Sequence, residues 1–84
     1  MAVDMYMRFE SEADREAVVG WLRKHTPYEI VEPEGGDVIL RMDEAQSDDA
    51  ATVQANVLIK TAYPETGVPL ERVRCQPGGW GPLG

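Results

Sequence analysis

Cysteine and histidine are almost absent from this chain of 84 residues, which contains only Cys75 and His25. One cysteine forms no internal disulfide, and one cysteine with one histidine supplies too few ligands for a structural zinc site. Apolar runs are no longer than three residues, whereas a membrane-spanning helix needs about 20. The first residues carry neither the basic region nor the apolar core of a secretory signal. We therefore expect a cytoplasmic domain without a membrane span, a metal ion or a cofactor.

Basic residues are also scarce, with eight Lys and Arg against 15 Asp and Glu and a formal net charge of −7. This balance argues against general binding to nucleic acids or anionic membranes. The acidity is regional, because residues 29–49 contain Arg41 as their only base and carry all of the net charge. We call the acids of this stretch the acidic segment: Glu29, Glu32, Glu34, Asp37, Asp43, Glu44, Asp48 and Asp49.

Periodicity predicts the first two elements clearly. Apolar and polar residues alternate strictly over residues 3–9, the pattern of a half-buried strand. Ser11 and the acids after it are typical of a helix N-terminus, and the pair Thr26-Pro27 predicts the end of that helix. On a helical projection, Ala13, Val18 and Leu22 fall on one apolar face that would pack on a core.

The second half of the chain repeats this organisation. Residues 28–32 and 37–42 are β-rich and are separated by a Pro-Glu-Gly-Gly turn, which predicts a hairpin. Ser47 then predicts a second helix that ends near Tyr63-Pro64, and residues 70–76 alternate again as a last strand. The order βαββαβ predicts an α+β ferredoxin-like fold, a four-stranded antiparallel sheet with two helices on one face. We expect one domain over residues 1–76 and an irregular Gly/Pro-rich tail over residues 77–84.

Helices on one face leave the other face of the sheet open. The residues expected there are Tyr6, Arg8, Ile39, Arg41, Arg72 and Arg74. Four converging arginines could dock an anionic partner such as a phosphorylated ligand or single-stranded nucleic acid. A simpler interpretation is cross-strand pairing of these arginines with Asp4, Glu10, Glu29 and Glu71. An RNA-recognition module has the same order of elements but needs two or three stacking aromatic residues, and only Tyr6 qualifies.

Three apolar residues outside the predicted core are further candidates for contact with a partner. Val53 and Val57 lie on the second helix roughly opposite its core face, so they should be exposed and could form part of a dimer interface. Trp80, in the tail, either folds back onto the domain or anchors a partner.

The sequence contains no catalytic arrangement that we recognise. His25 is expected near the end of the first helix, as a capping or packing residue. Cys75 alternates with Val73 on the core side of the last strand, where a thiol behaves as a small apolar group, and nothing supports a nucleophilic Cys75-His25 pair. The carboxylates of the acidic segment do not have the spacing of an EF-hand calcium loop.

Elimination therefore favours a small non-enzymatic protein-interaction or regulatory module that binds a protein partner or itself, as a homodimer, through the open sheet face. One alternative is an anion-binding or single-strand nucleic-acid-binding module that uses the Arg and Tyr side chains of that face. Another is an acidic inhibitor, of the kind that phages encode, whose acidic segment mimics phosphates and blocks a basic nucleic-acid-binding protein.

Overall fold

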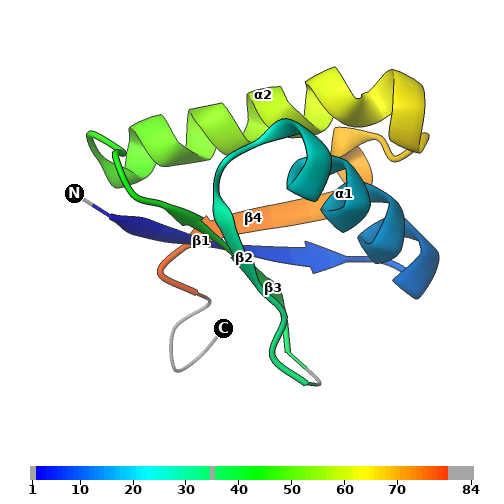
Figure 1. Ribbon diagram of the computed structural model, residues 1–84, viewed down its shortest axis with the longest axis horizontal. Coiled ribbons are helices and arrows are strands. Elements are labelled where there is room, and N and C mark those ends of the chain that lie inside the picture. Colours follow the sequence, from blue (N-terminus) through cyan, green and yellow to red (C-terminus); the bar gives the residue numbers. More distant parts are fainter. Residues whose placement is uncertain (1, 35, 80–84) are drawn as a thin grey trace.

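The computed structural model of the chain describes residues 2–34 and 36–79. Its elements, in chain order, are β1 (Val3–Phe9), α1 (Glu12–His25), β2 (Glu29–Val31), β3 (Val38–Met42), α2 (Asp48–Thr66), the short 3-10 helix η1 (Leu70–Arg72) and β4 (Val73–Pro77). The strands form an antiparallel sheet in the order β2-β3-β1-β4. Both helices cover the same face of this sheet (Figure 1). The predicted βαββαβ order and the ferredoxin-like α+β fold are thus confirmed.

Strand β1 lies between β3 and β4 and fixes which residues face the helices. Met5 pairs with Leu40 of β3, and Met7 pairs with Cys75 of β4. Because side chains alternate along a strand, Met5 and Met7 both point into the layer between sheet and helices, where they are fully buried. Tyr6, between them, points to the opposite side of the sheet, which we call the open face.

The helix ends follow from local capping. The hydroxyl oxygens of Ser11 and Ser47 accept hydrogen bonds from the backbone N–H three residues later, at 3.1 Å and 3.0 Å. At the end of α2, Gly67 adopts a left-handed φ of 71° and donates its N–H to the carbonyl of Tyr63 at 2.8 Å. The helix thus continues past its predicted end near Tyr63-Pro64. Pro64 removes only one N–H donor, in the last turn, and the helix ends at the cap formed by Gly67.

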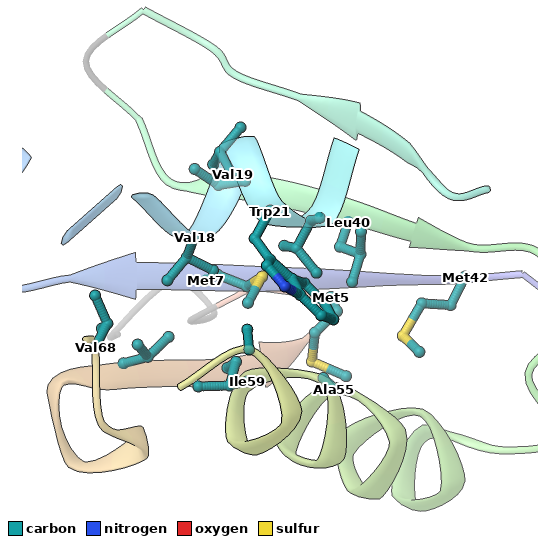
Figure 2. Packing of buried hydrophobic residues seen from close by; sticks show 14 of the residues in the cluster. Met5, Met7, Val18, Val19, Trp21, Leu40, Met42, Ala55, Ile59 and Val68 are labelled. Carbon is teal, nitrogen blue, oxygen red and sulfur yellow. The ribbon is translucent and has the colours of Figure 1, made fainter. Parts of the chain in front are cut away.

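The core lies between the sheet and the two helices (Figure 2). Its largest fully buried side chains include Met5, Met7, Leu22, Leu40 and Ile59. The residues that α2 buries are otherwise small, namely Ala51, Ala55 and Ala62, so its backbone can approach the sheet closely. Within the described residues, no helix combines the length and the apolar content that a bilayer span requires.

Two details of the helix and strand predictions are wrong. Ala13 is exposed, whereas Asp14, which lies one turn before the buried Val18, is only 9% exposed. The last strand begins three residues later than predicted, because residues 70–72 form η1 and so do not alternate between the two faces of the sheet. Arg72 is therefore placed on the helix side, where its Nε lies 3.3 Å from Oδ2 of Asp14 and compensates the buried carboxylate.

Candidate interaction site

The middle of the open face is an apolar row that crosses three strands. The backbone register aligns Val31 of β2 with Ile39 of β3, and Ile39 with Tyr6 of β1. All three residues are half-buried although α1 and α2 both lie on the other side of the sheet (Figure 1). Gln76 of β4 continues the row beside Tyr6. Val31 is the member of this row that the sequence analysis did not identify, because the short edge strand gave no clear alternation.

Two ion pairs flank the apolar row, one on each side. Nε and Nη2 of Arg8 donate to the two carboxylate oxygens of Asp37 at 2.9 Å and 3.1 Å. Nε and Nη2 of Arg41 donate to Asp4 at 3.0 Å and 3.3 Å, and Glu29 lies 3.8 Å from the same guanidinium. These hydrogen bonds raise the pKa of Arg8 and of Arg41. The predicted cross-strand pairing is confirmed for Asp4 and Glu29, which both pair with Arg41. It is wrong for Glu10 and Glu71, which form no ion pair within residues 2–34 and 36–79.

The signs of these charges alternate around the apolar row. Asp4 and Arg8 lie on β1 on either side of Tyr6, while Arg41 faces Asp4 and Asp37 faces Arg8 on the neighbouring strand. We call these four residues the charge frame. Its net charge is zero, so the open face does not form a strongly positive platform around Tyr6.

The four arginines predicted for the open face do not all reach it. Arg74 lies there, directly opposite Arg8 in the register of β4 with β1. Arg72 does not, because η1 carries it to the helix side, where its Nη2 also donates to the carbonyl of Gly67 at 3.2 Å. The prediction that Arg72 lies on the open face, from which its role in partner binding was inferred, is therefore wrong.

The chain that follows β4 turns onto the open face beside Tyr6. Gly78 donates its N–H to the carbonyl of Asp4 at 2.8 Å, which extends the pairing with β1. Gly79 has a φ of 91°, and a Cβ at this position would lie 3.5 Å from the Tyr6 ring. After β4, this segment lies on the side of the sheet opposite the helices (Figure 1). Trp80 lies outside the described residues.

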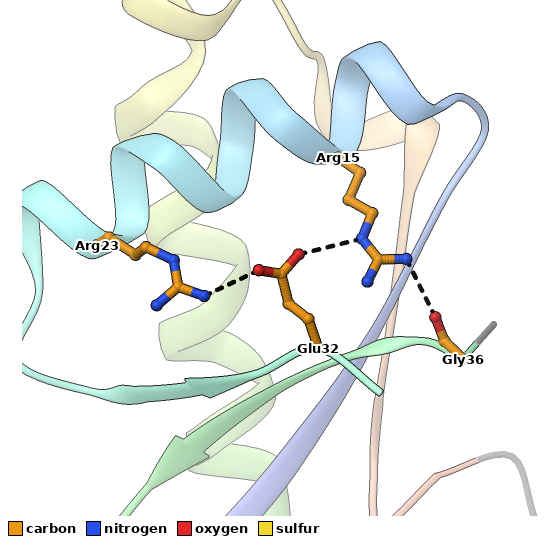
Figure 3. A network of polar contacts seen from close by, with 4 residues as sticks. All are labelled: Arg15, Arg23, Glu32 and Gly36. Carbon is orange, nitrogen blue, oxygen red and sulfur yellow. Dashed lines mark hydrogen bonds and ion pairs between the residues drawn. The ribbon is translucent and has the colours of Figure 1, made fainter. Parts of the chain in front are cut away.

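The acidic segment divides into two parts. Glu29 and Asp37 belong to the ion pairs of the open face, and Glu32 lies between two arginines of α1 (Figure 3). Its carboxylate accepts hydrogen bonds from Arg23 at 2.8 Å and Arg15 at 3.3 Å, and the Arg23 bond is the main reason that the pKa of Glu32 is lowered. Within the described residues, the remaining acids form no ion pair: Glu34, Asp43, Glu44, Asp48 and Asp49.

The outer face of α2 is exposed as predicted. Val53 and Val57 are 62% and 48% exposed, and Tyr63, which the sequence analysis did not select, is 51% exposed. Val53 and Val57 lie one turn apart on the same side of the helix. This surface is apolar but narrow, and it belongs to the layer opposite the open face.

His25 and Cys75 have separate structural surroundings. The His25 ring stacks on Trp21 with centroids 4.4 Å apart, and its Nδ1 lies 3.0 Å from the Trp21 carbonyl oxygen. Trp21 in turn donates Nε1–H to Glu65 at 2.7 Å. Burial raises the pKa of Cys75 to about 11, so this thiol is almost entirely protonated at neutral pH and is a poor nucleophile. Among residues 2–34 and 36–79, no cluster of His, Cys, Asp or Glu has an arrangement that could hold a metal ion.

Comparison of the chain with models of protein families, with curated proteins and with solved structures gives no match.

Proposed function

We propose that this domain is a non-enzymatic protein-interaction module that self-associates through the open face of its sheet. The observation that carries the proposal is the apolar row of Val31, Ile39 and Tyr6, with a charge frame of zero net charge around Ile39 and Tyr6. Burial of the apolar row favours association, and a neutral frame lets two acidic molecules approach on this side. We include a cytoplasmic location in the same proposal, because a chain with a single cysteine forms no internal disulfide and suits a reducing compartment.

The charge frame is self-complementary. If two copies face each other across a two-fold axis that runs along the strands between β1 and β3, each β1 lies over the other copy's β3. Tyr6 then lies over Ile39, and Asp4 and Arg8 lie over side chains of opposite charge, Arg41 and Asp37. A two-fold axis across the strands also pairs opposite signs, because the signs alternate diagonally. Such an isologous contact needs no second kind of partner.

The size of the open face sets the expected strength. The four strands have 7, 3, 5 and 5 residues. With a rise of about 3.4 Å per residue and a spacing of about 4.8 Å between strands, they give a flat footprint of about 330 Å². Stable interfaces bury about 800 Å² of accessible surface on each partner. We therefore expect a dimer with a dissociation constant in the micromolar range.

The anion-binding alternative has less support, because Arg8 and Arg41 are engaged by carboxylates and Arg72 lies elsewhere. An anion would have to displace Asp37 from a bidentate contact or Asp4 from Arg41. Strong loss of any anion binding on raising the salt concentration would support this alternative.

Sedimentation equilibrium at protein concentrations around the micromolar range tests the proposal. We expect a dimer for the unchanged chain and a monomer for Ile39→Lys, which places a charge in the apolar row away from Gly79. Val53→Lys, on the outer face of α2, is the matched control, because it makes the same change in net charge, and it should leave the dimer intact. A chain that is monomeric at every concentration, or a dimer that Val53→Lys abolishes and Ile39→Lys does not, would contradict the proposal. Circular dichroism checks that both variants fold.

A further inference from the structure

A groove lies at one end of the molecule, on the helix side of the sheet and apart from the open face. It is formed where β2 begins, where β3 ends and where α2 starts, and it has a volume of about 600 Å³. This is within the range of about 300–1,000 Å³ that ligand pockets usually have. Its apolar lining includes Tyr28, Met42, Ala45 and Ala51, all of which pack against or belong to the core.

Two acids, Asp43 and Glu44, line the same groove, and no basic residue of the described chain lines it. Most of the other acids of the acidic segment have evident structural roles. Glu29, Glu32 and Asp37 are paired with arginines, and Asp48 and Asp49 lie in the first turn of α2, where the helix dipole favours negative charge. Glu34, an exposed acid of the hairpin turn, forms no ion pair within the described residues and lies outside the groove. Asp43 and Glu44 form no ion pair within residues 2–34 and 36–79, and both precede the first turn of α2. Arg41, the nearest base along the chain, is held by Asp4 and Glu29, and Asp43 acts on it only as a more distant charge that also raises the pKa of Arg41.

We infer that this groove binds an arginine-bearing basic segment of a partner protein. The aliphatic stem of an arginine fits against Met42 and Ala51, while its guanidinium fits carboxylates bidentately and stacks on an aromatic ring such as Tyr28. Charge complementarity selects this occupant, because the rim of the groove is acidic and is attached to a molecule of net charge −7. This surface is separate from the open face, so the inference does not depend on self-association.

Titration of a fluorescein-labelled hexa-arginine peptide at 0.1 M salt tests the inference. The double variant Asp43→Asn/Glu44→Gln should weaken binding at least tenfold, because it removes two charge-assisted hydrogen bonds. The control Glu10→Gln/Glu16→Gln removes the same charge from exposed positions outside the groove and should change the affinity less than twofold. In NMR spectra, the peptide should shift the amide signals of Tyr28, Ala45 and Ala51.

Equal weakening in the two double variants would mean that only the overall acidity attracts the peptide, and the inference would be wrong. It would also be wrong if the unchanged chain failed to bind the peptide up to millimolar concentration. If Asp43→Asn/Glu44→Gln abolished the dimer but left peptide binding unchanged, the groove would take a second copy of the chain instead. Ile39→Lys, monomeric by the preceding proposal, should bind the peptide as well as the unchanged chain does, so that the two proposals fail independently.

Discussion

Gly20 lies in the middle of α1 on its exposed side, and a Cβ added there would meet nothing within 4 Å. Glycine in a helix costs roughly 0.5–1 kcal/mol relative to alanine, because it loses more backbone entropy on folding. We expect Gly20→Ala to raise the free energy of unfolding by about that amount and Tm by several degrees. Urea and thermal unfolding, followed by circular dichroism, measure the change.

Gly67→Ala is the matched control for this substitution. Gly67 also has open space around its Cβ position, but its φ of 71° is left-handed, which costs a residue with a side chain about 1–2 kcal/mol. This variant should therefore be destabilised. If Gly20→Ala were also destabilised, the position would have to be one where an added methyl group is not tolerated, and the argument from helix propensity would be wrong.

Residue positions within the sheet were predictable where the alternation is strict and failed where it is interrupted. The alternation of β1 correctly assigned Met5 and Met7 to the core and Tyr6 to the open face. Arg72 was misassigned because alternation was assumed from Leu70, whereas η1 precedes the strand. The pairing of Arg72 with Asp14 joins residues 58 positions apart, and nothing local in the sequence indicates it.

At the scale of elements, the ion pairs of Glu32 connect α1 to the edge of the sheet. Strand β2 has only three residues and pairs with β3 alone, so it gains little from backbone pairing. Glu32 follows it directly and binds Arg15 and Arg23, which lie about two turns apart on α1 (Figure 3). Arg15 also donates a hydrogen bond from Nη1 to the carbonyl of Gly36, and this bond ties the hairpin turn to the same helix.

The lowered pKa of Glu32 predicts a pH-dependent contribution to stability. A carboxylate whose pKa is lower in the folded state stabilises the fold above its unfolded value, near 4.5, and loses this contribution as the pH falls through the folded value. The unchanged chain should thus be more stable than Glu32→Gln at pH 6, by less than about 1 kcal/mol because the pairs are exposed. The difference should shrink as the pH falls below 4.5 toward pH 3.

Urea unfolding at intervals between pH 3 and pH 6 measures this difference. Glu34→Gln is the control, since Glu34 is exposed and forms no ion pair within the described residues. Its stability should follow that of the unchanged chain at every pH. The prediction would be wrong if Glu32→Gln were as stable as the unchanged chain at pH 6, or if it were less stable by the same amount at pH 3 and at pH 6.

All of the strands and both helices were predictable, because each has a cap, a turn or a clear period in the sequence. The contacts between elements were less predictable. The apolar row depends on the register of three strands, and the sequence placed Ile39 and Tyr6 on the open face without aligning them with Val31. The groove at Asp43 and Glu44 depends on how the loop before α2 packs, which no pattern in that loop specifies.

At the scale of the whole molecule, charge and apolar surface are separated. The open face combines an apolar row with a neutral charge frame, whereas Asp43, Glu44, Asp48 and Asp49, which form no ion pair within the described residues, lie around the start of α2. Two acidic molecules can therefore associate through the open face while their acidic ends remain available to basic partners. The long-range repulsion between two acidic molecules still opposes this association, and salt screens it.

Self-association should consequently become tighter as salt is added. Two molecules of charge −7 with centres one domain thickness apart, 21 Å, repel by roughly 5 kcal/mol at 0.01 M salt and roughly 1 kcal/mol at 0.1 M. The dissociation constant measured by sedimentation should fall at least tenfold between these concentrations. A dimer that dissociates on adding salt would instead be held by attraction between oppositely charged surfaces, and the apolar row would not be its main contact.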